Sequence, residues 1–272
     1  MLTWRPVEAV VLDMDGLLID TEPTWRTASA VVFAGFGIVL SEQDLLDSTG
    51  QPIEELIPIW RRRASGGGSA SGGGSASDGG DARLTDAEVA DLIIDQVIAH
   101  VKAEGEPMPG VAAAIALFRR CGLRLAIASS SPRRLIDAVC DRLGLDGIEV
   151  RCSAMDEARG KPAPDVYLTA ARRLGVTAAS CLALEDSPNG VTSAKAAGMC
   201  CVAVPDPLLV GDPRFGEADL VLRSLTDLDE PALRRLGMPV PLPHQGHQDS
   251  PAVGPGATTT KHRGGQDDND EA

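Results

Sequence analysis

The sequence predicts an α/β fold: a Rossmann-like, doubly wound parallel sheet with a small α-helical cap domain inserted into it. Two observations predict the sheet. Short apolar runs recur along the chain, and helix-like segments separate them. Alternation of this kind is typical of a parallel sheet with helices on both faces. A third observation predicts the insertion, because a long helix-like stretch lies between the first apolar run and the second.

Five short apolar runs are the candidate strands. The first, Val7–Asp13, reads VEAVVLD, and an unbroken apolar run of this length is typical of a strand buried on both faces. The later runs resemble it and are Leu123–Ser129, Ile148–Ser153, Cys181–Glu185 and Met199–Val204. The helix-like segments around them are Val111–Cys121, Pro132–Leu143, Pro164–Leu174 and Val191–Ala197.

Residues 19–105 form the predicted cap domain, and residues 1–18 and 106–238 form the predicted core domain. Three cap segments look helical: Glu22–Ala34, Ile53–Arg63 and Thr85–Ala103. Pro58 should kink the second of them. Residues 64–82 are Gly/Ser-rich and repeat the letters SGGGSA, so we interpret them as a flexible loop expansion or an engineered linker. The tail, residues 239–272, has a composition typical of disorder.

Composition restricts the partners of the protein. The 272 residues carry a net charge of −14, which disfavours nucleic acids and acidic membrane surfaces, because both require basic patches. The six cysteines form no CxxC pair, so we expect buried thiols in a reducing compartment and no zinc site. No apolar stretch reaches transmembrane length. Cleavage of a signal peptide would remove the first aspartates, so we expect a cytoplasmic protein. We also expect the protein to be a monomer.

Two aspartates follow the first candidate strand. Asp13 and Asp15 are one residue apart, and on an extended backbone such side chains face the same way. Their repulsion should disturb at least one pKa unless a divalent metal or a lysine lies nearby. A carboxylate held in this way can act as a nucleophile, and a protonated carboxyl can donate to a leaving alcohol. Taken alone, the pair is equally consistent with a turn, a helix cap or a calcium loop.

Three later segments place further polar groups beside predicted strand ends, where doubly wound sheets bind ligands. Ser129–Ser131 precede a helix, in the sequence ASSSP, and form a candidate anion site. Lys161, in GKPAPD, could direct its ammonium towards the aspartates. Glu185 and Asp186, in LEDSPNG, add hard oxygen ligands suited to magnesium. Each segment alone could be a cap, a solvated lysine or a turn, but their joint occurrence favours one common site.

The segments DMDGLLIDTEP, ASSSP, GKPAPD and LEDSPNGVTSAKAAGM resemble the four signature motifs of the haloacid dehalogenase superfamily. The resemblance runs from about Val7 to Asp229, and the helical insert after the first strand matches the branch with a small helical cap. Within that branch, DGLLIDTEPTW, DSTGQPIEELIPIW and GDPRF are similar to bacterial sugar phosphatases that act on hexitol phosphates and 2-deoxyglucose 6-phosphate.

The resemblance implies a Mg²⁺-dependent phosphatase that hydrolyses a small sugar phosphate or sugar-alcohol phosphate through an aspartyl phosphate. It implies that Asp13 is the nucleophile and a metal ligand. It also implies that Asp15 protonates the leaving oxygen, activates water and binds Mg²⁺ through its backbone carbonyl. An acid at Asp15 suits an alcohol leaving group, whereas a dehalogenase expels halide and needs no acid there.

The same resemblance assigns the remaining site residues. Ser129, Ser130 and Lys161 would bind the phosphoryl group, with Lys161 neutralising the charge that it shares with the nucleophile. Asp186 would hold Mg²⁺, and Glu185 would be either a direct ligand or one bridged by water.

Several alternatives remain open at this point. A β-phosphoglucomutase-type mutase shares every motif, and phosphoglycolate or a nucleotide phosphate is another possible substrate. A non-catalytic binding protein on the same fold is disfavoured, because no catalytic group is missing. Within the predicted cap, Glu22, Trp25 and the Gly50–Gln51 segment are the candidates for contacts with a sugar.

Overall fold

The structure is a computed structural model that describes residues 6–46, 52–66, 84–207, 209–236 and 238. All of these residues belong to the first of two compact units, Met1–Pro241. The predicted disordered tail, residues 239–272, and most of the predicted flexible insert lie outside the described residues.

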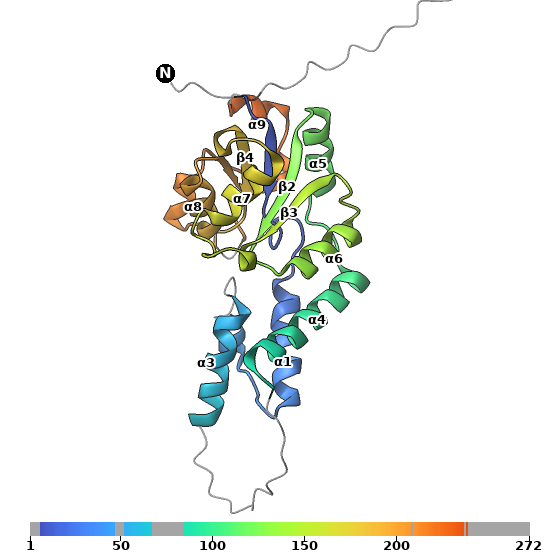
Figure 1. Cartoon of the computed structure of the whole chain (residues 1–272), viewed down its shortest axis with the longest axis vertical. Helices are drawn as coiled ribbons and strands as arrows, with labels where there is room; N and C mark the ends of the chain where they lie inside the picture. Colours follow the sequence, from blue (N-terminus) through green and yellow to red (C-terminus); the bar gives the residue numbers. More distant parts are fainter. Residues whose placement is uncertain (1–5, 47–51, 67–83, 208, 237, 239–272) are drawn as a thin grey trace, which may run out of the picture. The chain divides into compact units, whose positions relative to one another are not determined.

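A parallel sheet of six strands forms the centre of the fold (Figure 1), which confirms the predicted fold class. The strands lie in the order β3-β2-β1-β4-β5-β6, and every neighbouring pair is parallel. Their bounds are Ala9–Leu12 for β1, Arg124–Ser129 for β2, Ile148–Ser153 for β3, Cys181–Glu185 for β4, Cys200–Ala203 for β5 and Leu220–Val221 for β6. The order reverses at β1, between β2 and β4, and such a switch point is where doubly wound sheets bind ligands.

Burial on both faces explains why the strands read as unbroken apolar runs. In β1, Val10 and Leu12 join one hydrophobic cluster, whereas Ala9 and Val11 join another on the opposite face. Helices α5 (Val111–Arg120) and α6 (Arg133–Leu143) supply the first cluster, and α7 (Asp165–Leu174) and α8 (Pro188–Ala196) supply the second. Figure 1 shows these two pairs on opposite sides of the sheet.

Among the described residues, four helices lie between β1 and α5: α1 (Glu22–Gly35), α2 (Glu42–Leu46), α3 (Ile53–Gly66) and α4 (Asp86–Glu104). The buried side chains of α1, α3 and α4 share a core, in which Phe33 of α1 meets Trp60 of α3 edge to face with ring centroids 5.2 Å apart. Helix α3 contains Pro58 and still continues to Gly66. The boundaries of this region as a separate cap domain, residues 19–105, stay a prediction.

The structure adds elements that the sequence did not predict. Strand β6 and helix α2 are too short to produce a periodic pattern. The remaining helices are α9 (Glu230–Arg235) and the 3-10 turns Ala154–Asp156, Ala178–Ser180, Pro213–Glu217 and Leu225–Asp227. All six cysteines are free, and four of them are buried. Within the described part of the chain, every helix is too short or too polar to span a bilayer.

Candidate active site at the carboxyl ends of the strands

Strand β1 ends directly before Asp13, and the chain then makes a tight turn. The backbone N–H of Asp13 donates to the carbonyl of Leu184 in β4, which continues the strand pairing to this residue. Gly16 has a φ of +79°, and a Cβ built on it would lie 2.1 Å from Asp186 Oδ2. A glycine is therefore required at position 16 both for the turn and for the close approach of the Asp186 carboxylate.

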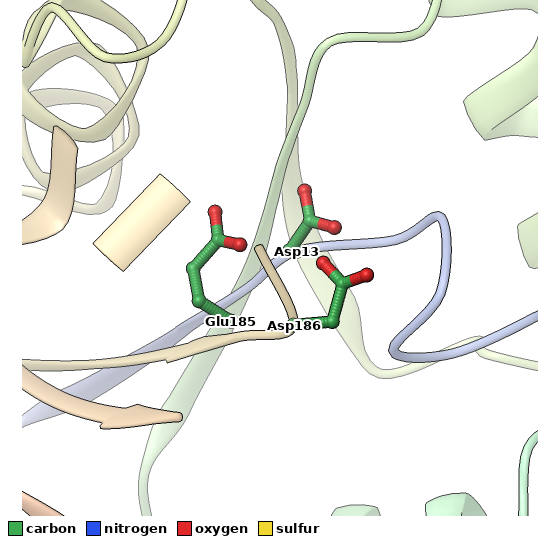
Figure 2. A group of neighbouring side chains, drawn as sticks. All are labelled: Asp13, Glu185 and Asp186. Atoms are coloured by element: carbon green, nitrogen blue, oxygen red, sulfur yellow. The ribbon is translucent and has the colours of Figure 1, made fainter. Parts of the chain in front are cut away.

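Three buried carboxylates meet at this switch point. Asp13 follows β1, Glu185 ends β4 and Asp186 follows it, and Figure 2 shows the three side chains together. Each offers one oxygen that lies within 4.8 Å of the oxygens of the other two. This is the type and spacing of ligands that a hard divalent cation prefers.

One ammonium group lies among these carboxylates. Lys161 Nζ donates to Asp13 Oδ1 at 2.6 Å and to Glu185 Oε1 at 2.5 Å, and its side chain is only 6% exposed. A buried lysine in contact with two buried acids forms a strong local link between β1, β4 and the loop before α7.

The cluster places three acids and one ammonium together in a buried site. Burial raises the pKa of Asp13 to about 7; Lys161 opposes that shift, whereas the charges of Glu185 and Asp15 add to it. Burial also raises the pKa of Asp186 well above its usual range, with the charges of Asp13 and Glu185 as further causes. Burial alone would lower the pKa of Lys161, but the neighbouring acids outweigh it and raise that pKa. A divalent cation would relieve this imbalance.

Asp15 has a different set of partners from Asp13. Its Oδ1 accepts a hydrogen bond from Thr21 Oγ1 at 2.5 Å, and its Oδ2 accepts from Ser131 Oγ at 2.8 Å and Ser129 Oγ at 3.1 Å. The Asp15 carboxylate is therefore oriented by hydroxyl groups, whereas the Asp13 carboxylate is oriented by an ammonium.

The structure brings most of the predicted site residues together, and their roles stay proposals. Ser129 is buried; its hydroxyl contacts Asp15 and accepts the backbone N–H of Ser131 at 2.9 Å. Ser130 is exposed. Glu22 and Trp25 lie in the first turn of α1, both half-buried. The Gly50–Gln51 segment lies outside the described residues.

Two side chains of the site, Thr21 and Tyr167, were not among the predicted site residues, and Ser131 was predicted only as part of the candidate anion site. Thr21 and Ser131 orient Asp15, and Tyr167 donates its hydroxyl to Glu185 Oε1 at 2.5 Å. Ser131 stands in the ASSSP segment, so the spacing of two residues from Ser129 was a usable signal. Thr21 and Tyr167 lie six residues after Asp15 and Lys161, respectively, and no local pattern indicates their contacts.

Known proteins resemble this chain in sequence and in fold. Residues 7–198 match the model of the haloacid dehalogenase-like hydrolase family. Hexitol phosphatase B of Escherichia coli (strain K12) is 37% identical, and the match covers 84% of this chain and 97% of that protein. CbbY of Rhodobacter capsulatus is 35% identical over 81% of this chain and 94% of its own length.

Solved structures extend the comparison. The crystal structure of CbbY from Rhodobacter sphaeroides in complex with phosphate has a TM-score of 0.67, with 30% identity over 82% of this chain and 96% of that one. A mutant of the same protein, in complex with xylulose-(1,5)bisphosphate, has a TM-score of 0.66 with the same identity and coverage. The family match and the names of the relatives confirm the expected enzyme class, a phosphatase of the haloacid dehalogenase type. The chain therefore belongs to the haloacid dehalogenase-like hydrolase family.

Proposed function

We propose that the protein is a Mg²⁺-dependent phosphatase that hydrolyses a small sugar phosphate or sugar-alcohol phosphate through an aspartyl phosphate on Asp13. One observation carries the proposal: a buried carboxylate bound by a buried ammonium at 2.6 Å lies within a cluster of acids at the switch point of the sheet. A carboxylate so placed is restrained in position and ready to attack phosphorus.

The first step of the proposed reaction transfers the phosphoryl group. Asp13 attacks phosphorus, the bond from phosphorus to the ester oxygen breaks, and the leaving oxygen takes a proton from Asp15. Lys161 offsets the charge that Asp13 and the phosphoryl oxygens bring together. Phosphoryl transfer depends mostly on positioning and charge stabilisation, which are what these fixed side chains supply.

The second step returns the enzyme to its starting state. Asp15 takes a proton from water as that water attacks the aspartyl phosphate, and the bond between phosphorus and the Asp13 oxygen breaks. Inorganic phosphate then leaves. The hydrogen bonds from Thr21, Ser129 and Ser131 keep Asp15 in one orientation for both proton transfers.

The residues present fit a magnesium ion. One oxygen from each of three buried carboxylates lies within 4.8 Å of the other two, and the ammonium of Lys161 contacts Asp13 and Glu185. The ion would be held by the carboxylates of Asp13 and Asp186 and by the backbone carbonyl of Asp15. Glu185 is a further candidate ligand. When bound, Mg²⁺ would stabilise negative charge on the phosphoryl oxygens. In enzymes of this kind that stabilisation amounts to about 3 kcal/mol or more.

The substrate class follows from the relatives and is part of the proposal. One relative is named a hexitol phosphatase, and another has been crystallised with a sugar bisphosphate. We assign substrate choice to the helices between β1 and β2, with Glu22 and Trp25 of α1 as candidate contacts. A β-phosphoglucomutase-type mutase is the alternative, because it would use the same four motifs.

A phosphate-release assay tests the proposal. The panel contains hexitol phosphates, hexose 6-phosphates, β-glucose 1-phosphate, phosphoglycolate and nucleoside monophosphates, each with Mg²⁺ or with EDTA. We expect sugar or sugar-alcohol phosphates to be hydrolysed best, EDTA to abolish the activity and added Mg²⁺ to restore it. Interconversion of glucose phosphates without phosphate release would instead favour the mutase.

The nucleophile is tested with a matched pair of variants. Asp13→Asn should lower kcat by a factor of about 10³ or more, because the amide is a poor nucleophile. Asp20→Asn removes an exposed carboxylate from the same segment and should keep the wild-type rate. Equal activity in wild type and Asp13→Asn would contradict the assignment of Asp13.

A further inference from the structure

Tyr167 is a buried polar residue of the site to which the proposed reaction gives no role. It lies in the first turn of α7, its side chain is fully buried, and it is the only tyrosine in the chain. Packing alone would be satisfied by phenylalanine at this position, so the hydroxyl needs its own explanation. That hydroxyl donates to Glu185 Oε1 at 2.5 Å.

The two oxygens of Glu185 have unequal partners. Oε1 receives two close donors, the Tyr167 hydroxyl and Lys161 Nζ, each at 2.5 Å. Oε2 has longer contacts, with the hydroxyl of Ser187 at 3.3 Å and its backbone N–H at 3.4 Å. The orientation of this carboxylate therefore depends mainly on Tyr167 and Lys161.

The ammonium of Lys161 is shared between two acids. It donates to Asp13 Oδ1 at 2.6 Å as well as to Glu185, so the hydrogen bonds run from Tyr167 through Glu185 and Lys161 to Asp13. A lysine side chain is a flexible stem, and its charge is held only by its partners. The Tyr167 ring also lies beneath the ammonium, with Nζ 5.1 Å from the ring centroid.

We propose that Tyr167 is a positioning residue of this enzyme: its hydroxyl fixes Glu185 so that Lys161 stays in contact with the nucleophile Asp13. The inference rests on the proposed function. Tyr167 is fully buried, and its hydroxyl donates to Glu185 and accepts from Lys161 Nζ at 3.5 Å, so its loss should slow the chemical step and leave substrate binding unchanged.

The main test compares Tyr167→Phe with Thr169→Val. The first variant removes only the hydroxyl. The second removes another buried hydroxyl from the same helix, one that contacts Arg172 and no residue of the acid cluster. We expect Tyr167→Phe to lower kcat about tenfold with KM unchanged, which is the effect of losing one hydrogen bond to a charged group. Thr169→Val should keep the wild-type kcat.

Two further measurements separate positioning from a structural role. Calorimetric titration with Mg²⁺ should give close to the wild-type affinity in Tyr167→Phe, because the hydroxyl donates to Glu185 and not to Asp13 or Asp186, the other two carboxylates of the cluster. In a double-mutant cycle, Tyr167→Phe should cause a smaller loss of kcat once Glu185→Ala is present, because the carboxylate that the hydroxyl positions is then absent. A weakened Mg²⁺ affinity together with multiplicative losses in the cycle would overturn the inference in favour of a general structural effect.

The outcomes distinguish this inference from the proposed function. A wild-type protein that hydrolyses no ester of the panel refutes the proposed function, and the inference with it. An active wild type with an equally active Tyr167→Phe refutes the inference alone.

Should Tyr167→Phe not fold, biosynthetic fluorotyrosine labels residue 167 alone, because the chain has one tyrosine. Its fluorine NMR resonance should move when Mg²⁺ and beryllium fluoride are added, since an adduct on Asp13 changes the contacts of Lys161. A resonance that stays in place would overturn the inference.

Discussion

At the scale of single residues, Asp13 and Asp15 are chemically identical but have different surroundings. Asp13 is buried with an ammonium and two further acids, and burial raises its pKa to about 7. Asp15 is bound by the hydroxyls of Thr21, Ser129 and Ser131. Different surroundings are what the two proposed roles require, one carboxyl group as nucleophile and the other as acid and base.

The hydroxyl of Thr21 should be needed for the acid–base role of Asp15. Thr21→Val keeps the shape of the side chain and removes the donor to Asp15 Oδ1, so we expect kcat to fall about tenfold, as for loss of one hydrogen bond to a charged acceptor. Thr27→Val is the control, since that exposed hydroxyl of helix α1 donates to the carbonyl of Pro23. Steady-state phosphate release measures both. If Thr21→Val kept the wild-type kcat, its hydroxyl would not orient Asp15.

At the scale of elements, the junction of β4 and α8 places two of the acids. Ser187 caps α8 by accepting the N–H of Gly190 at 3.1 Å, and Pro188 occupies the first turn. The chain after β5 supports the same junction, because the N–H of Val204 donates to the carbonyl of Glu185 at 2.7 Å. The acids are thus held by helix capping and by strand neighbours rather than by a free loop.

Gly190 should be intolerant of any side chain. A Cβ at this position would lie 1.9 to 2.0 Å from the atoms of the Glu185 carboxylate, so Gly190→Ala must displace that carboxylate. We expect the free energy of unfolding to fall by about 1–3 kcal/mol and kcat to fall with it. Denaturant titration and the phosphate-release assay measure the two effects.

Gly35→Ala is the matched control for that experiment. It also places a methyl group on a helical glycine, but nothing lies within 4 Å of the added Cβ. Its stability should stay equal to that of wild type or rise by about 0.4–1 kcal/mol, through a less flexible unfolded chain. Unchanged stability and activity in Gly190→Ala would show that the Glu185 carboxylate can move without cost.

At the scale of the whole molecule, the negative net charge and the buried acids of the site both disfavour the approach of an anionic substrate. The chain carries a net charge of −14, and its buried acid cluster concentrates part of the negative charge in one place. An anionic substrate must therefore rely on local positive charge, which Lys161 and a bound cation would supply. Binding of a cation there would link folding stability to cation concentration through these same carboxylates.

Mg²⁺ should stabilise the protein more at pH 8 than at pH 6. The pKa of Asp13 is raised to about 7 and that of Asp186 is also raised, so the folded protein binds protons at pH 6 that the unfolded chain has lost. The contribution of these groups to stability without Mg²⁺ therefore declines as pH rises through about 7. Mg²⁺ binds the deprotonated carboxylates, so the increase in Tm that it causes should grow over that interval.

Differential scanning calorimetry with and without Mg²⁺ at the two pH values measures this effect. Asp13→Asn should reduce the pH dependence of the Mg²⁺-induced shift, whereas Asp20→Asn should leave it as in wild type. A shift of equal size at both pH values would show that protons and Mg²⁺ do not compete for this cluster.

Patterns along the chain predicted much of this architecture. Unbroken apolar runs such as Val7–Asp13 predicted β1 because a strand buried on both faces has no polar alternation. Strand β6 and helix α2 were missed, since so few residues form no period. The sequence predicted one common site for four residues, Asp13, Lys161, Glu185 and Asp186. Their motifs follow or adjoin strand ends, and a parallel sheet brings those strand ends to one edge.

The sequence by itself determined the fold class, the family and the identity of the acids and the lysine, because residue type and local spacing carry that information. Only the tertiary structure decided which atoms meet: Lys161 contacts Asp13 across 148 positions, and Ser129 contacts Asp15 across 114. It also decided that Thr21 and Ser131 orient Asp15 and that Tyr167 binds Glu185. Such pairings depend on how strands and helices pack, and no local pattern encodes the direction in which a side chain then points.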